Sequence, residues 1–522
     1  MNSYINNQQN TKRGTESSFI PFAQSPIWQL QREYFENKGI QAWSTGEVPH
    51  YVTNNPYTAK VYANIVLGFL RDHYAPHMPD EPVYIVELGT GSGRLTYHLL
   101  LALVQLAEAA ADQIPPFVYV MTDFVQENLD FWEIHPRLKP FFESGILDYA
   151  LFDAEKDTTI YLQKHQRTLT PKSVSQPIVA LANYFFDAIP QELFYIDEGQ
   201  VYQTLIHLGD FNDPDVREMD VRYGYELIEE PPFEEPSLRQ LFRQYQQQME
   251  NSHLLFPHIG LRCLTNIKAL SLKGLLLITA DKAAHQLEKW QNRPEPYMAP
   301  HGGCFSLTVN YHALKEHCHF QGGKALLPSQ ASPGITIGAF LYVNKPENCY
   351  ETLLNYQAHV NDFGTDDFFS IKKHIEQEIP TLSPRSLFAY LRLAHYDVRL
   401  FRQFLPRFQK LASTFNDQAR EEVLKTAQRV WRNYYPMGES YDLAAETGFL
   451  LQTLQFPSEA ITFFQWSEQI QGSKEEVQYQ QALCYQTLGE IETCKALLEK
   501  ILAHNPRHQP TTGLLNELLN HH

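Results

Sequence analysis

The chain lacks the features of a disulfide-bonded, membrane-spanning or polyanion-binding protein. Its six cysteines are spread over 522 residues without a Cys-x-x-Cys pair, which fits a reducing compartment better than a disulfide framework. No apolar run approaches the roughly 20 residues that a membrane helix needs, and no run of Lys and Arg suggests a basic surface. A formal net charge of -18 repels nucleic acid and anionic lipid alike. We therefore expect no nucleic-acid partner and no membrane association.

The N-terminal stretch also lacks targeting signals. Residues 1–20 are polar, without the apolar region of a signal peptide or the Arg-rich amphipathic pattern of mitochondrial import. We expect them to be disordered and the protein to be cytoplasmic. The full sequence is 43% hydrophobic and 13% aromatic, enough for sizeable cores, and its length predicts two or three domains.

A glycine-rich turn follows a buried-type strand near residue 90. Val83 to Leu88 is a short apolar run rich in β-branched residues, and Leu95 to Leu106 has helical spacing. Between them the glycines alternate with other residues, at Gly89, Gly91 and Gly93. Such a turn leaves bare backbone amides at a helix N-terminus, where a ligand can approach closely. A glycine turn with a purely structural role is the alternative.

The spacing of the glycines in this turn distinguishes a dinucleotide site, a P-loop and an S-adenosylmethionine (SAM) site. A dinucleotide fingerprint needs a third glycine where Arg94 stands, and the Gly-Lys-Ser/Thr ending of a P-loop is absent. The remaining pattern, Glu-x-Gly-x-Gly-x-Gly beginning at Glu87, resembles motif I of class I methyltransferases that use SAM.

Further strands, alternating with helices, predict a largely parallel α/β sheet of the Rossmann-like class. We expect these strands at residues 117–122, 147–152, 176–182 and 274–280, with closing strands at 325–327 and 335–343. The first four end in polar residues: Asp123, Asp153, Asn183 and Asp281. Any one of these could be only a helix cap or turn former. Together, at the ligand-binding edge of a parallel sheet, they indicate a site.

The chemistry of SAM assigns a role to each acidic group. Asp123 is placed to accept the ribose hydroxyls, and Asp153, followed by Ala154, to accept the adenine amine. Glu87 and the loop from Gly89 through Thr90 to Gly93 are expected to meet the methionine ammonium.

Two segments outside the sheet should shape the site. Helices expected at residues 27–34 and 57–70 precede the first strand and would lie over the ligand crevice. After the fourth strand the pattern breaks between about 194 and 260, where we expect an inserted hairpin and a helix at 238–249. Insertions there commonly build the substrate side of a site.

The segment 182–190, Ala-Asn-Tyr-Phe-Phe-Asp-Ala-Ile-Pro, ends the fourth strand beside the expected methyl group. The carbonyl of Asn183 can accept a hydrogen bond from an amine or guanidine and aim its lone pair at the methyl carbon. Capping of the next turn is the alternative role for Asn183. Tyr184 could wall the pocket and favour a cation, or it could be a core aromatic.

Four stretches make residues 25–345 resemble the MidA-like methyltransferases, relatives of the mitochondrial complex I assembly methyltransferase, which modifies arginine on a protein. They are residues 50–64, the glycine loop 87–93, residues 183–190 and residues 306–322. The resemblance implies SAM binding at the glycine loop and Glu87, and substrate-side roles for Asn183 and Asp187. The chain departs from the family pattern at Tyr184, where a Glu is usual, and at Thr90, Ser92, Asp281 and Asn310.

A group of histidines and cysteines near residue 310 could suggest a zinc site. Its members are His301, Cys304, His312, His317, Cys318 and His319. Adjacent side chains in His-Cys-His point in directions that do not converge, and no further ligand pair completes four. We predict no metal site.

The C-terminal third has helical spacing and a repeat of about 34 residues. Gly448, Leu451, Ala460 and Phe464 are echoed by Ala482, Tyr485, Cys494 and Leu498. This resembles two tetratricopeptide (TPR) units, with helical neighbours at 387–411 and 419–434; an ordinary helical bundle is the alternative. TPR faces bind protein segments, which predicts a protein partner or substrate.

The sequence thus predicts a disordered N-terminus (1–20), a SAM-dependent methyltransferase domain (21–345) and an α-helical TPR-like domain (346–522). The expected activity is methylation of an arginine-like side-chain nitrogen on a protein recruited by the repeats. Two alternatives stay open: a catalytically weak or inactive SAM-binding scaffold, and a small-molecule methyltransferase.

Overall fold

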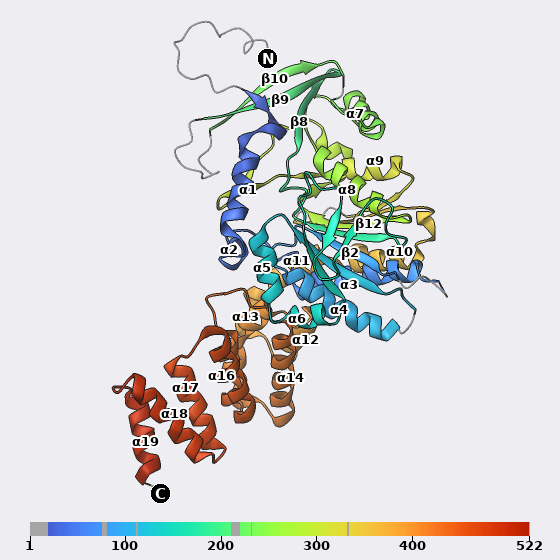
Figure 1. Ribbon diagram of the computed structural model, residues 1–522. Coiled ribbons are helices and arrows are strands. Elements are labelled where there is room, and N and C mark those ends of the chain that lie inside the picture. The colour runs from blue at the N-terminus through green and yellow to red at the C-terminus, as the bar shows by residue number, and fades with distance from the viewer. Residues whose placement is uncertain are drawn as a thin grey trace.

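The computed structural model describes residues 19–75, 81–110, 113–209, 220–230, 232–330 and 334–520. The chain forms an α/β part, blue to yellow in Figure 1, followed by a series of helices, orange to red, that leads to the C-terminus. The disorder predicted for residues 1–20 falls almost entirely on residues 1–18, outside the described residues. In the described ranges, no helix combines the length and the apolar character that crossing a membrane requires.

A seven-stranded sheet forms the centre of the α/β part. From edge to edge its strands are β17 (Lys324–Leu326), β18 (Thr336–Val343), β12 (Gly274–Asp281), β7 (Ile178–Asn183), β2 (Val83–Leu88), β3 (Phe117–Asp123) and β4 (Leu147–Leu151). Neighbours are parallel from β4 to β12, whereas β18 is antiparallel to both β12 and β17. The predicted α/β sheet is confirmed, and the strand order reverses between β2 and β7, the point where such sheets bind ligands.

Helices cover both faces of this sheet because alternate side chains of its strands point to opposite sides. In β2, Val83 and Ile85 enter one hydrophobic core, and Tyr84 and Val86 enter another. The first core includes α3 (Pro56–Asp72), α4 (Arg94–Ala110), α5 (Gln126–Ile134) and α10 (Tyr350–Tyr356), and α6 (Lys139–Glu143) lies beside β4. The second includes α8 (His258–Leu270) and α9 (Tyr311–Phe320).

The inserted segment is larger than the predicted hairpin and helix. The hairpin of β8 (Glu192–Asp197) and β9 (Gln200–Leu208) and the helix α7 (Pro236–Gln248) are present. The two strands belong to a five-stranded antiparallel sheet completed by β10 (Val221–Ile228), β11 (Ser252–Phe256) and β1 (Ile20–Pro21). Sequence spacing could not show that a two-residue strand from the N-terminus joins this sheet. Because β1 pairs with β9, it anchors the start of α1 (Pro26–Lys38), the helix beside the ligand crevice.

The remaining short elements connect these layers. They are α2 (Gln41–Ser44), the pair β5 (Ile160–Leu162) and β6 (Arg167–Leu169), the pair β13 (Ala283–Ala284) and β16 (Val309–Asn310), and the pair β14 (Ala299–His301) and β15 (Cys304–Ser306).

The C-terminal third is helical throughout its regular structure. Its α-helices after α10 are α11 (Thr365–Glu378), α12 (Pro384–Leu393), α13 (Val398–Leu411), α14 (Asp417–Asn433), α15 (Leu443–Thr453), α16 (Pro457–Gln471), α17 (Glu475–Thr487), α18 (Ile491–His504) and α19 (Gln509–Asn520). From α15 onward each helix packs against the next. A Cβ on Gly448 would lie 2.5 Å from the ring of Phe464, so α15 and α16 approach closely at this small residue. Their assignment as TPR-like units stays a prediction.

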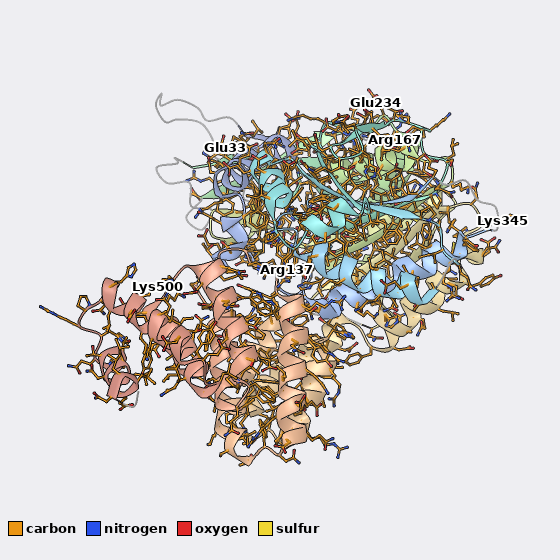
Figure 2. The ribbon with its side chains drawn as sticks, turned by 60° about the horizontal axis from the view of Figure 1, so that its bottom comes forward. Glu33, Arg137, Arg167, Glu234, Lys345 and Lys500 are labelled. Atoms are coloured by element: carbon orange, nitrogen blue, oxygen red, sulfur yellow. The ribbon has the colours of Figure 1, made fainter. Side chains whose placement is uncertain are left out.

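One hydrophobic core continues across the predicted boundary at 345. It joins Ile85 of the central sheet to Trp431 of α14 and Phe464 of α16. Figure 2 shows Arg137 at the junction of the two parts, where its side chain donates a 3.0 Å hydrogen bond to the carbonyl of Trp431. The domain boundaries themselves stay predictions.

Candidate functional site

A cavity lies at the carboxyl edge of the central sheet, beside α1. Its volume is about 120 Å³. Of the predicted site residues, Gly89, Asp123, Asp153, Ala154 and Tyr184 line it. The helix α1 contributes Trp28, Gln31, Arg32 and Phe35, whose spacing of three and four residues places them on one helix face. The N-terminal helical layer therefore meets the crevice, as its position in the sequence predicts.

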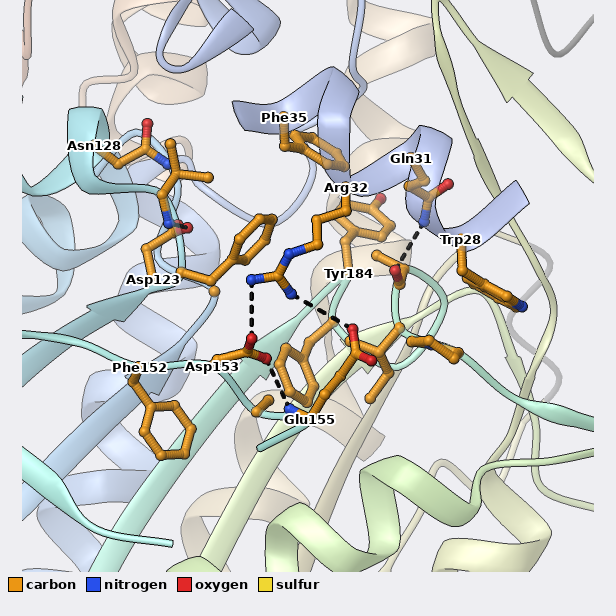
Figure 3. A pocket seen from close by; sticks show the side chains of 18 of the residues that line it. Trp28, Gln31, Arg32, Phe35, Asp123, Asn128, Phe152, Asp153, Glu155 and Tyr184 are labelled. Carbon is orange, nitrogen blue, oxygen red and sulfur yellow. Dashed lines mark hydrogen bonds and ion pairs between the residues drawn. The ribbon is translucent and has the colours of Figure 1, made fainter. Parts of the chain in front are cut away.

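Arg32 lines this cavity and reaches from α1 to Asp153, beyond the end of β4. Its Nη2 lies 2.9 Å from Asp153 Oδ2 and its Nη1 3.6 Å from Glu155 Oε1, as the dashed lines in Figure 3 show. Its guanidinium also stands 4.2 Å from the centroid of the Phe124 ring. Burial alone would raise the pKa of Asp153, but hydrogen bonds from Lys156, the Glu155 amide and Arg32 hold that pKa below its ordinary value. A planar nitrogen donor thus stands over an aromatic ring and is bonded to a carboxylate.

Asp123 ties the glycine loop to β3. Its Oδ2 accepts a hydrogen bond from the Gly91 amide at 2.9 Å, and its Oδ1 accepts one from the Val125 amide at 3.1 Å. Burial raises the pKa of this carboxyl group even though both amides favour the ionised form. Each oxygen keeps lone pairs, so Asp123 can still accept from a ligand in the cavity it lines.

Glu87 points into the core instead of the cavity. One of its carboxyl oxygens, Oε2, accepts hydrogen bonds from Thr96 and from Tyr119, the latter at 2.8 Å. Burial raises the pKa of Glu87 to about 7, and the carboxyl group is not among the groups lining the cavity. Its predicted contact with the methionine ammonium stays a prediction.

The glycine loop is covered by side chains from distant segments. Gly91 has φ +59, and a Cβ there would lie 2.8 Å from the Trp43 ring of α2. Gly93 has φ +78, and a Cβ there would lie 2.8 Å from Tyr435 Oη. Thr90 is buried, and its hydroxyl donates a hydrogen bond to the Glu87 carbonyl at 3.3 Å. The room that these glycines leave is therefore occupied by protein in this conformation.

Asn183 is the last residue of β7, and only the oxygen of its side-chain amide is hydrogen-bonded within the described residues. Its Oδ1 accepts a 2.6 Å hydrogen bond from the Tyr62 hydroxyl, whereas its Nδ2 is buried without a partner among the described residues. The carbonyl expected to receive the acceptor nitrogen is thus already engaged. No cap hydrogen bond from the Asn183 side chain occurs within the described residues.

Tyr184 has a backbone conformation that side chains seldom adopt. Its φ is +47, and its amide donates a 3.0 Å hydrogen bond to the Ala280 carbonyl. Such left-handed geometry in a bulky residue costs about 1 kcal/mol or more and is concentrated at functional sites. Here it sets the phenol at the wall of the cavity.

Asp187 and Asp281 form a buried carboxyl pair behind the site. Burial raises the pKa of Asp187 to about 7, and burial together with the Asp187 charge raises that of Asp281 well above its ordinary range. The pair therefore holds a proton near neutral pH. Asp281 is bonded to the hydroxyls of Thr279 and Tyr311, each at 3.2 Å, whereas Asp187 Oδ1 has no partner among the described residues.

The histidines and cysteines near residue 310 are bonded elsewhere in the fold. His301 bonds Ser306 at 2.9 Å, His312 bonds Tyr245 at 2.8 Å, and Cys318 is buried. Across the part of the chain that the structure describes, no three His, Cys, Asp or Glu side chains are grouped to hold a metal ion.

Sequence reasoning missed four aromatic or cationic residues at this site: Arg32, Trp43, Phe124 and Tyr435. The signal for Arg32 was present, since it shares a helix face with Trp28 and Phe35. Phe124 directly follows Asp123 and so was within reach of the same strand-end argument. Tyr435 has no local signal, because only tertiary packing brings it to the glycine loop.

Comparison with known proteins adds distant likenesses only. No protein-family model matches the chain, and no curated protein matches it. One solved structure that matches is an uncharacterized COG1565 superfamily protein from Burkholderia thailandensis, at 13% identity and a TM-score of 0.40, covering 63% of this chain and 90% of that one. Another, described as a likely methyl transferase of that superfamily and bound to S-adenosyl-homocysteine, has 14% identity and a TM-score of 0.41, covering 64% and 90%. An O-methyltransferase family protein from the same organism has 8% identity and a TM-score of 0.24, covering 61% and 72%. At these TM-scores the likenesses carry no argument about activity.

Proposed function

We propose that this chain is a SAM-dependent methyltransferase acting on an arginine-like side-chain nitrogen of a protein that its C-terminal helices recruit. The observation that supports it best is the placement of Arg32. Its guanidinium makes the two contacts that a purine with an exocyclic amine needs, stacking on Phe124 and donating to Asp153. The glycine loop lies beside these groups, at the edge where α/β sheets bind ligands.

The residues of the cavity fit this cofactor once Arg32 withdraws. Asp153 would accept the adenine amine, Phe124 would stack on the ring, and Asp123 would accept ribose hydroxyls. SAM, when bound, supplies a methyl group on a sulfonium. Because that methyl is already activated, the chain has only to bind and orient the acceptor.

The methyl acceptor would be bound and oriented at the end of β7. Tyr184 offers an aromatic wall that favours a cationic side chain. Asn183 Nδ2, buried without a partner among the described residues, would donate a hydrogen bond that positions a carbonyl or carboxylate of the acceptor. Asp187 Oδ1, which has no partner among the described residues, would take up the proton that the acceptor nitrogen releases, since burial raises the pKa of Asp187 to about 7.

A catalytically weak or inactive scaffold is the second candidate. The observation in its favour is that Arg32 and Trp43 occupy the space beside the glycine loop. In that case the helices would carry the function.

Calorimetry with SAM tests the proposal. We expect micromolar binding to the full chain and its loss in Ala154→Trp, which would fill the cavity without straining a glycine. Ala503→Trp, on the exposed face of α18, is the matched control and should bind as the wild type does. Absence of SAM binding to the folded wild type would refute the methyltransferase.

Transfer of a labelled methyl group then separates the candidates. Label in the protein fraction of an extract supports a protein acceptor. Label in small molecules alone would indicate the small-molecule methyltransferase, and binding without transfer would indicate the scaffold.

A further inference from the structure

A groove adjoins the proposed cofactor cavity at Tyr184. It is lined by residues 46 and 48–52, by Tyr184, by one face of α11 and by Arg399 of α13, and its volume is about 530 Å³. Tyr184 lines both the groove and the cavity, so the two adjoin at this residue. A segment lying in the groove would pass the end of β7.

The groove is basic in an acidic protein. Three cations line it, and Glu376 is the one carboxylate among the described residues that does so. Glu376 is already bonded to Lys372 and Gln403. A net charge of -18 would otherwise repel anions, so this local excess is a specific feature of the surface.

Two of the cations are available to a ligand. Lys373 is exposed and forms no ion pair with any described residue. Arg399 is exposed as well; its guanidinium lies 4.7 Å from the centroid of the Tyr51 ring and is likewise unpaired within the described ranges. Among the described residues no ion pair joins Arg399 to the nearby Asp397, whose Oδ1 accepts hydrogen bonds from the Tyr51 hydroxyl at 2.7 Å and the Leu400 amide at 2.8 Å.

A second cavity extends the groove inward. It has a volume of about 270 Å³ and shares Gly46, His50, Tyr51 and Arg399 with the groove. Two of its lining atoms, Asn54 Oδ1 and His98 Nδ1, are buried without a partner among the described residues. Buried polar atoms are normally bonded, so these two indicate a polar group that arrives from outside.

We infer that this groove docks an acidic peptide segment of the acceptor protein, with carboxylates on Lys373 and Arg399 and the acceptor side chain directed past Tyr184. The inference rests on the proposed function, which it deepens by naming the substrate class. A peptide is favoured over a small acid because the cations stand on two helices and the groove continues into a polar cavity.

Fluorescence anisotropy with a dye-labelled ten-residue glutamate peptide tests this inference without SAM. We expect the full chain to bind it, with an affinity that falls as salt rises. The double reversal Lys373→Glu and Arg399→Glu should weaken binding at least tenfold. The matched control, Lys425→Glu and Lys500→Glu, changes the net charge equally on exposed positions outside the groove and should stay within twofold.

Several outcomes would overturn the inference. They are no binding by the wild type, equal loss in both double variants, or full displacement by free glutamate at equal residue concentration, which would indicate a small acid. Circular dichroism and thermal melting establish that each variant is folded, and Lys373→Glu alone, at an unpaired surface site, gives the same test if the double variant is not. Because SAM binding is measured separately, failure of the cofactor proposal is distinguished from failure of the groove.

Discussion

At the scale of residues, the position of one arginine governs access to the site. The Arg32 guanidinium competes with an incoming ring for Phe124 and with an incoming amine for Asp153. Its side chain is about one-fifth exposed, so solvent partly screens the ion pair. A contact of this strength can be displaced, yet its loss should be measurable.

Arg32→Ala is expected to tighten SAM binding. Cation–π stacking and a partly exposed ion pair together contribute about 1 to 1.5 kcal/mol, which corresponds to a gain of roughly five- to tenfold in affinity. Calorimetry measures it, with Arg32→Lys as a control that keeps the charge but not the planar stack. Weaker binding by Arg32→Ala would mean that the arginine belongs to the binding site.

Glu87 should make stability depend on pH. Its pKa is about 7 in the folded chain, against an ordinary value of 4.5. Between these values the folded state holds a proton that the unfolded state has released, so the free energy of unfolding falls as pH rises, by at most about 3 kcal/mol. Glu87→Gln cannot ionise and should flatten this part of the curve.

Thermal melting from pH 4 to 8 measures that difference. The Asp187–Asp281 pair has raised pKa values as well and contributes a slope of the same sign in both proteins. Melting curves of Glu87→Gln and wild type that stay parallel over this range would argue that Glu87 is ionised in the fold.

At the scale of elements, the glycine loop is constrained both by its own backbone and by what packs on it. Gly91 and Gly145 both have positive φ, +59 and +77, but only Gly91 faces a neighbouring ring. A Cβ on Gly145 would meet nothing within 4 Å. Comparing substitutions at the two glycines therefore distinguishes the cost of backbone strain from the cost of steric overlap.

Gly91→Ala should destabilise the protein more than Gly145→Ala. Left-handed geometry costs alanine about 1 to 2 kcal/mol at either position, and contact with Trp43 adds to this at Gly91 alone. Chemical denaturation gives both values. Trp43→Ala in the Gly91→Ala background should recover the additional loss, and equal losses at the two glycines would contradict this account.

Strands and helices of the α/β part were largely predictable, because apolar runs and glycine turns are local signals. The carboxylates at the ends of β3 and β4 were found for the same reason. Trp43 and Tyr435 were not, since no local pattern indicates which distant side chain will cover a glycine. The size of the inserted sheet was also missed, because β1 is only two residues long.

At the scale of the whole molecule, the helices after 345 share a core with the sheet. Leu400 and Phe404 of α13 and Trp431 of α14 belong to the same cluster as Ile85. Helices α17 to α19 instead form a small cluster of their own around Ala482 and Leu498, although Val477 and Cys484 belong to the large one and Tyr485 packs against it.

Truncation after residue 345 is therefore expected to abolish folding, whereas truncation after Gly472 should be tolerated. Truncation after residue 345 exposes the large hydrophobic cluster, whereas truncation after Gly472 removes mainly the small cluster of α17 to α19. Gel filtration and thermal melting distinguish the outcomes, with a fall of a few degrees expected for the shorter deletion. A cooperative transition at the wild-type temperature in residues 1–345 would show that the sheet is an independent unit.

The contact between Tyr435 and the glycine loop also constrains how the two parts of the chain can evolve. Its hydroxyl donates a 3.0 Å hydrogen bond to the Ser92 carbonyl, 343 positions earlier, and Arg94 pairs with Glu439. A gene fusion that exchanged these helices for another array would remove the cover from the loop. The two halves must then have diverged together, so substitutions near 92 and near 435 should be correlated among descendants of this gene.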